Sequence, residues 1–301
     1  MRPSILEGRP RMSGDAFAVA GVVLRDDIRQ CRRTSIVASW RFINTGAGTG
    51  AVNMAIDEAM LLGVNRGTTQ PTVRVYAWEP PTVSLGYAQQ IEDELDLDAV
   101  RRFGFGVVRR PTGGRAVLHA GELTYSVVGP AGEDPLGSSI MEAYEAIARA
   151  LAAGLGRLGV DVELAPVATE AMSRDGASPP CFASAGRYEV VVGGKKLIGS
   201  AQRRVGRGVL QHGSLLTDAT HEQIADVILA ADDRRRETVR RLLAQKTTHL
   251  QALLGRPVGF AEVAEAVKLG FAHAWGVSLD EGRLTETERD VAETLATEYA
   301  I

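Results

Sequence analysis

The residues best placed to carry chemistry in this chain are a cysteine and a lysine, Cys181 and Lys196. The chain contains only two cysteines. Cys181 precedes a strand-like run at 187–192, and the Gly193-Gly194 turn that follows leads the chain back to Lys196. Such a hairpin can bring both side chains together, and an ammonium beside a thiol favours the nucleophilic thiolate. The pair indicates a covalent acyl or alkyl carrier, although most free cysteines are small buried hydrophobic residues.

A second group of candidates is a glycine-rich stretch flanked by arginines. Paired glycines allow a backbone to approach a ligand closely, and arginine donates well to phosphate or carboxylate. The stretch lacks the Gly-Lys-Ser/Thr ending of a P-loop and is also compatible with an ordinary turn between strands. Its candidate site residues are Arg110, Thr112, Gly113, Gly114, Arg115 and His119.

A third group follows Lys196 and contains Gly199, Ser200 and Ala201, with His212 on the next strand. Small residues at neighbouring strand positions leave room for a ligand on one face of a sheet. A dyad of the cysteine with His119 or His212 is an alternative to the cysteine–lysine pair. The sequence has no metal-binding spacing such as His-Glu-x-x-His or Cys-x-x-Cys, so we expect no metal.

The composition limits the kinds of protein this can be. The 301 residues are 45% hydrophobic and 24% charged, enough for a sizeable core in one large or two smaller domains. The net charge of −3 gives no reason to expect nucleic acid or a membrane as a partner. Two cysteines argue against a disulfide framework and favour a reducing compartment, so we expect a cytoplasmic protein.

The elements that must position these residues follow an α/β order and then a helical one. Residues 1–39 are rich in arginine and are predicted to be a tail, possibly disordered. Alternating and β-branched residues predict strands at 72–78, 83–87, 106–110, 123–128, 160–164, 187–192, 196–202 and 208–216.

Helices are predicted on both sides of these strands. One covers residues 53–62 with Asn53 as its N-cap, and another covers 92–103. A long amphipathic helix begins at a Ser139-x-x-Glu142 capping box. Further helices are predicted at 221–231, 234–244, 248–254, 260–275 and 285–299. These C-terminal helices are compatible with a small second domain or with a lid.

Taken in order, three segments resemble motifs of the biotin/lipoate protein ligase superfamily. They are Arg-Arg-x-Thr-Gly-Gly-x-Ala-Val-x-His at 109–119, Gly-x-Lys-x-x-Gly-Ser-Ala-Gln at 194–202 and Leu-Gln-His-Gly at 210–213. The second motif makes Lys196, rather than Lys195, the family lysine. The segments at 40–43 and 53–59, and Cys181-Phe182 before 188–192, are similar to the LipM-type octanoyltransferases.

The resemblance implies an α+β fold, a mixed and mostly antiparallel sheet flanked by helices. It places an acyltransferase domain at 40–301, with a core at about 64–279 and C-terminal helices from about 221. It also implies transfer of an octanoyl group from octanoyl-acyl carrier protein to a lysine of a lipoyl domain, such as the glycine cleavage H protein. Cys181 would carry the acyl group, Lys196 would assist it, and no cofactor would be needed because thioester exchange is nearly isoenergetic.

Two further assignments depend on proximity to the motifs. Val117, Leu118, Ala201 and Val209 are predicted to form the apolar slot for the acyl chain. An acidic carrier or lipoyl domain would be attracted by a basic docking patch, which we predict at Arg109, Arg110, Arg115, Arg203, Arg204 and Arg207.

Three alternative functions remain open from the sequence. The donor of the octanoyl group can be an octanoylated H protein and the acceptor an E2 lipoyl domain, with the same cysteine chemistry. An ATP-dependent lipoate ligase would use Lys196 against an acyl-adenylate and leave Cys181 idle. A module that binds lipoyl domains without catalysis is the alternative of a different class.

Overall fold

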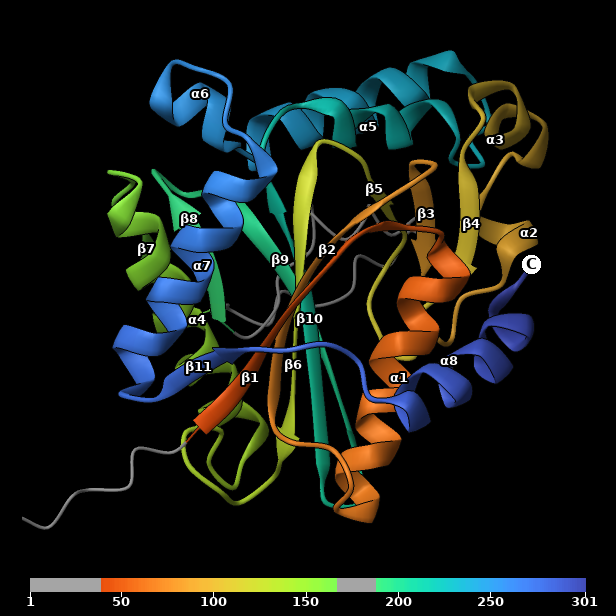
Figure 1. Cartoon of the computed structure of the whole chain (residues 1–301). Helices are drawn as coiled ribbons and strands as arrows, with labels where there is room; N and C mark the ends of the chain where they lie inside the picture. The colour runs from red at the N-terminus through yellow and green to blue at the C-terminus, as the bar shows by residue number, and fades with distance from the viewer. Residues whose placement is uncertain (1–38, 167–187) are drawn as a thin grey trace, which may run out of the picture. The chain divides into compact units, whose positions relative to one another are not determined.

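Two β-sheets organise the chain in the computed structural model, which describes residues 39–166 and 188–301 (Figure 1). Cys181, the loop before it and the predicted tail, apart from Ser39, lie outside the described residues. The large sheet has the strand order β11 (Ser278–Glu281), β1 (Ser39–Gly48), β2 (Thr72–Trp78), β6 (Glu122–Pro130), β10 (Gly208–Leu216), β9 (Lys195–Val205), β8 (Tyr188–Val192), β7 (Glu163–Pro166).

Most neighbouring strands of this sheet are antiparallel, and the parallel pairs among its described strands are β11 with β1 and β1 with β2. A small sheet contains β4 (Gly106–Arg109), β3 (Thr82–Leu85) and β5 (Val117–His119), in that order. The predicted fold class, a mixed and mostly antiparallel sheet flanked by helices, is therefore confirmed.

Two pairs of helices cover opposite faces of the large sheet. On one side α4 (Ile140–Arg157) packs against α7 (Phe260–Trp275), and on the other α1 (Gly50–Arg66) packs against α8 (Glu286–Tyr299) (Figure 1). Adjacent residues of β6 show this division, because Val127 belongs to the α4–α7 core and Val128 to the α1–α8 core. The sheet thus lies between two hydrophobic layers.

The remaining helices are short or peripheral: α2 (Ile91–Glu94), α3 (Leu97–Phe103), the 3₁₀ segment η2 (Thr220–Asp226), α5 (Asp233–Lys246) and α6 (Leu250–Leu254). Within the described ranges, no helix is both long and apolar enough to cross a membrane. The C-terminal segment belongs to the compact unit Val37–Ile301, since its helices pack on α4 and α1 and β11 extends the large sheet.

Several element predictions are confirmed and others are corrected. The strands at 72–78 and 208–216 and the Ser139–Glu142 capping box are present as predicted. The N-cap of α1 is Thr49 rather than Asn53, because the Thr49 hydroxyl accepts the Val52 N–H.

Two predicted helices have a different form in the structure. The helix predicted at 92–103 is divided into α2 and α3, because Leu95 pairs with Ile228 and the Asp96 carboxylate caps α3. The helix predicted at 221–231 is the 3₁₀ segment η2. In both places a contact with another segment or a short turn replaces the continuous helix that the local sequence predicts.

Candidate active site

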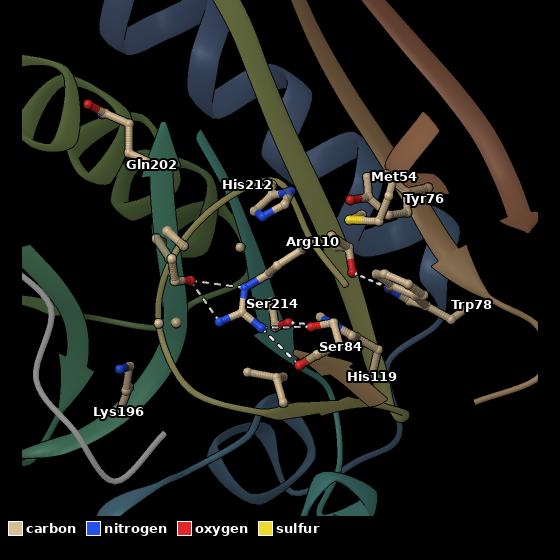
Figure 2. Close-up of a pocket in the computed structure, with 18 of the residues that line it drawn as sticks. Met54, Tyr76, Trp78, Ser84, Arg110, His119, Lys196, Gln202, His212 and Ser214 are labelled. Carbon is tan, nitrogen blue, oxygen red and sulfur yellow. Dashed lines mark hydrogen bonds between the residues drawn. The ribbon is translucent and has the colours of Figure 1, made fainter. Parts of the chain in front are cut away.

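The three sequence motifs meet around one cavity of about 270 Å³ (Figure 2). The loop between β4 and β5 supplies one wall and the β9–β10 hairpin supplies another. In this hairpin His212 pairs with Ala201 and Gly213 with Ser200, which brings the second and third motifs side by side. The predicted site residues that line the cavity are Arg110, Gly113, Gly114, His119, Lys196, Gly199, Ser200, Ala201 and His212.

Other predicted residues do not line this cavity. Thr112 is buried behind it, and Arg115 turns toward Glu94, with Nη2 3.5 Å from its Oε2. Of the predicted acyl slot, Val117 and Ala201 line the cavity. The prediction is wrong for Leu118 and Val209, because both side chains pack in the hydrophobic cores and do not line the cavity.

Arg110 holds the glycine-rich loop in place. Its guanidinium donates to the carbonyls of Gly113 and Arg115 on one side and to the carbonyl and hydroxyl of Ser84 on the other, at 2.7–3.1 Å (Figure 2). The loop approaches β3 so closely that a Cβ at Gly86 would lie 2.0 Å from the Gly114 carbonyl oxygen. Since Arg110 is buried, its predicted role in a docking patch is wrong.

A buried network centred on Asp57 supports the same loop. The Asp57 carboxylate accepts hydrogen bonds from Arg74, Tyr76, Ser126 and His212 Nδ1, at 2.7–3.1 Å. His212 Nε2 lies 2.6 Å from the hydroxyl of Thr112 in the loop. With Nδ1 donating to the carboxylate, Nε2 accepts from the threonine, so a buried charge on α1 fixes the loop through one imidazole.

The ionisation of this network follows from its burial. Burial alone raises the pKa of Asp57, but the charge of Arg74 and the hydrogen bond from His212 outweigh it, so the pKa is lowered from its usual value. Burial lowers the pKa of His212, against the hydrogen bond and charge of Asp57, which raise it. His212 is therefore a neutral imidazole at neutral pH.

A second histidine, His119, is the last residue of β5 in the small sheet and lines the cavity. Its Nε2 is 2.7 Å from the Ser84 hydroxyl and its Nδ1 is 2.8 Å from Glu122 Oε1. Its ring stacks on Trp78 with centroids 4.0 Å apart. Glu122 Oε2 is buried and has no hydrogen-bond partner among the described residues. His119 is thus held on both nitrogens while the carboxylate behind it keeps an open acceptor.

Lys196 lines the cavity and is buried, whereas Lys195 is exposed and donates to the Ala244 carbonyl. Lys196 Nζ lies 2.5 Å from Glu189 Oε1 on β8, in an ion pair with both side chains largely buried. Glu189 was not among the site residues predicted from the sequence. The sequence signal that could have identified it is an acidic residue within the apolar run of β8, the strand that pairs with β9.

Ser200 ends a directed chain of hydrogen bonds on the cavity wall. Gln211 Nε2 donates to the Tyr125 hydroxyl at 3.1 Å, and that hydroxyl lies 2.7 Å from Ser200 Oγ. Burial raises the pKa of Tyr125 to about 12, so the phenol keeps its proton. Either hydroxyl can donate in the Tyr125–Ser200 bond, and when Tyr125 donates, the Ser200 hydroxyl is left to donate into the cavity.

The cavity also has an apolar end that the sequence analysis missed. Met54 from α1 and Tyr76 and Trp78 from β2 line it, on the far side of Arg110 from Lys196 in Figure 2. No spacing rule links these residues to the motifs, because the sheet brings α1 and β2 to the site. Within the described ranges, no three His, Cys, Asp or Glu residues are grouped to hold a metal ion.

The fold is that of lipoate protein ligases. The chain superposes with a TM-score of 0.71 on a bipartite lipoate protein ligase from Thermoplasma acidophilum, at 23% identity over 86% of this chain and 92% of that one. It superposes with a TM-score of 0.68 on a lipoate-protein ligase A bound with ATP, at 24% identity over 86% of this chain and 95% of that one.

Sequence comparison defines the family. The model of the lipoyl protein ligase A/B catalytic domain matches residues 49–272. The chain is 45% identical to octanoyltransferase LipM of Kyrpidia tusciae, over 87% of this chain and 96% of that one, and 44% identical to that of Symbiobacterium thermophilum, over 85% and 94%. The chain belongs to the lipoyl protein ligase A/B catalytic domain family, and its predicted resemblance to LipM-type octanoyltransferases is confirmed.

Proposed function

We propose that this protein transfers an octanoyl group from an acyl carrier protein to a lysine of a lipoyl domain through a thioester on Cys181. The observation that carries the proposal is the meeting of all three motifs at one cavity, with Lys196 buried in its wall, in a chain whose relatives are octanoyltransferases. The reaction belongs to lipoate biosynthesis. The low cysteine content supports a reducing, cytoplasmic setting.

In the first step the Cys181 thiolate attacks the donor's thioester carbonyl. A new carbon–sulfur bond forms, the bond to the carrier's sulfur breaks, and that sulfur leaves as a thiolate that takes up a proton. One thioester replaces another, so the step needs no ATP. The Lys196 ammonium favours the attacking thiolate and then donates to the carbonyl oxygen as charge develops there.

In the second step the acceptor lysine attacks the acyl-enzyme as a free amine. A carbon–nitrogen bond forms, the bond to Cys181 breaks, and the proton that the amine loses is taken up by the leaving Cys181 sulfur, which returns to a thiol. The Ser200 hydroxyl donates into the cavity and supports the same oxyanion, along with backbone N–H groups of the 113–114 and 199–200 segments. The product amide is more stable than the thioester, which drives the transfer forward.

The apolar end of the cavity supports a medium-length acyl chain. Met54, Tyr76 and Trp78 line it and offer carbon surface beyond Arg110. Burial of each methylene contributes about 0.8 kcal/mol, so shortening the chain by two carbons would weaken binding by roughly tenfold. The acceptor is a lipoyl domain, and we favour the H protein over E2.

Mass spectrometry of the intact protein tests the proposal. Incubation with octanoyl-carrier protein in the absence of ATP should produce a single octanoyl adduct that is absent from Cys181→Ser, and addition of H protein should discharge it. If no adduct forms but octanoate and ATP modify a lipoyl domain, the protein is a ligase and the proposal is wrong. An adduct formed only from octanoylated H protein would instead establish amidotransfer to E2.

The neighbouring lysines provide a matched pair for the role of Lys196. Lys196→Ala should slow adduct formation by about 10²-fold, because a donor to the developing oxyanion is lost. Lys195→Ala, one position away and exposed, should react at the rate of the unmodified protein. Equal rates for both variants would refute the pairing of Lys196 with Cys181.

A further inference from the structure

The charged residues of α5 lie on two different flanks of the helix. The helix has the sequence DRRRETVRRLLAQK, and Val239 and Leu243 are buried beneath it. Its acids Asp233 and Glu237 pair with Arg236 and Arg240, at 3.1 Å and 2.8 Å. These ion pairs occupy one flank of the helix and neutralise it.

The other flank carries four exposed basic residues, Arg234, Arg235, Arg241 and Lys246. None of them forms an ion pair or a side-chain hydrogen bond within the described ranges. At 3.6 residues per turn, position 234 lies beside 241 and position 235 beside 246, and the two rows are about 120° apart on the side of the helix away from its ion pairs. We call this set the α5 basic face.

The C-terminal end of α5 is joined to β9, the strand that carries Lys196. Thr247, directly after α5, pairs with Lys196 in a parallel bridge, and the Thr248 N–H donates to the Lys196 carbonyl at 3.0 Å. From there α5 lies across one end of the large sheet (Figure 1). Its 14 residues extend for about 21 Å. The α5 basic face therefore extends away from the strand that carries Lys196.

The arginines near the motifs are engaged within the molecule, unlike those of the α5 basic face. Arg109 donates to the carbonyl of Gln89, Arg203 to that of Pro111 and Arg204 to that of Ser138. Arg207 lies 3.4 Å from Glu133. Each of these four arginines thus has a partner within the molecule, whereas the side chains of the α5 basic face have none within the described ranges.

We propose that the α5 basic face is the docking surface for the acidic carrier protein that delivers the octanoyl group, a proposal that rests on the proposed function. A carrier presents its thioester on a long flexible arm, so its body can dock along a helix that extends well away from Lys196. An acceptor lysine has only a four-carbon stem, which requires its domain to dock at the cavity mouth. The length of the α5 basic face fits the donor.

Charge reversal tests this assignment. The triple variant Arg234→Glu, Arg235→Glu, Arg241→Glu should raise the KM for octanoyl-carrier protein at least tenfold at low salt and remove most of its salt dependence. Adduct formation from the uncharged thioester S-octanoyl-N-acetylcysteamine should be unchanged, because the cavity is intact. A control of equal charge change, Arg66→Glu, Arg157→Glu, Arg289→Glu on α1, α4 and α8, should behave as the unmodified protein.

The outcomes separate the two proposals. If the unmodified protein forms no adduct with octanoyl-carrier protein, the proposed function fails. If it forms the adduct and the α5 variant has the same KM as the control variant, the docking surface is refuted. A rise in the KM for the lipoyl domain, with the KM for the carrier unchanged, would assign the face to the acceptor and overturn our proposal. Circular dichroism of each variant checks that it is folded.

Discussion

The two buried histidines of the site, His212 and His119, are held by networks that differ in one respect. The carboxylate behind His212, that of Asp57, accepts four hydrogen bonds and faces the guanidinium of Arg74. The carboxylate behind His119, that of Glu122, has partners on one oxygen, while the other oxygen is buried without a partner among the described residues.

This difference indicates that the two networks have different roles. A saturated network stabilises one arrangement, and every member depends on the others. A buried acceptor without a partner has a free-energy cost, and it is tolerated where a site must accommodate a charge or a ligand. We therefore infer that the His212 network positions the glycine-rich loop, and that the His119 network, whose imidazole stacks on Trp78, belongs to the apolar end of the cavity.

The largest effect is expected from a substitution that breaks the saturated network around Asp57. Asp57→Asn leaves the Arg74 guanidinium buried without its counter-charge, so the free energy of unfolding should fall by about 3–5 kcal/mol. Urea denaturation measures it. Asp98→Asn, which removes an exposed ion pair with Arg101, should cost less than about 1 kcal/mol. Similar losses for the two variants would show that the Asp57 network is not the stronger support.

Acidification tests whether buried neutral histidines support the fold. Burial lowers the pKa of His212, and it lowers that of His221 to about 4. Between about 6.5 and 4 the unfolded chain binds protons that the folded chain does not, so stability falls as the pH falls. The shift of His221 corresponds to about 3 kcal/mol.

Urea denaturation at pH 7 and pH 4.5 measures this loss, and His221→Gln should reduce it. A free energy of unfolding that does not change over this range would contradict the neutral, buried state of both imidazoles. The carboxylate of Asp57 acts in the same direction at lower pH, since its lowered pKa adds stability that is lost as protons bind to it.

A third effect concerns the Ser200 hydroxyl, which is hydrogen-bonded to Tyr125 on the cavity wall. Ser200→Ala should lower kcat for octanoyl transfer by about 10²-fold with little change in KM, as expected for a donor to a developing oxyanion. Tyr125→Phe leaves the hydroxyl in place but undirected, so its loss should be smaller, about tenfold. A Ser200→Ala variant with normal kcat would limit Ser200 to a packing role.

The smallest expected effect concerns the network with the open acceptor. Glu122→Gln keeps an oxygen for His119 and Thr124 and puts an amide where the carboxylate oxygen has no partner, so the free energy of unfolding should fall by only about 1 kcal/mol. Thermal or urea denaturation beside Asp57→Asn gives the comparison directly. A loss as large as that of Asp57→Asn would remove the distinction between the two networks.

The sequence predicted the parts of this site that depend on local pattern. Strand β2 and the capping box follow from residue types over short spans, and the motifs identified the loop with Arg110 and the hairpin with Lys196. Trp78 was not identified, because its position at the site depends on the pairing of strands distant in sequence. Glu189 was not identified either, although it lies only one hairpin away from Lys196. Strand β11 is four residues long and half exposed, so its register with β1 leaves little trace in its own sequence.

The pairing of β1 with β11 has a consequence for synthesis on the ribosome. Domains fold from the N-terminus as the chain emerges, yet the outer edge of β1 is covered only when residues 278–281 have been made. The Arg41 guanidinium also lacks its counter-charge until Glu288 has been made; in the folded protein the two groups are 2.7 Å apart. A nascent chain stalled before β11 would present an unpaired strand edge and an uncompensated cation, which makes it a target for self-association or a chaperone.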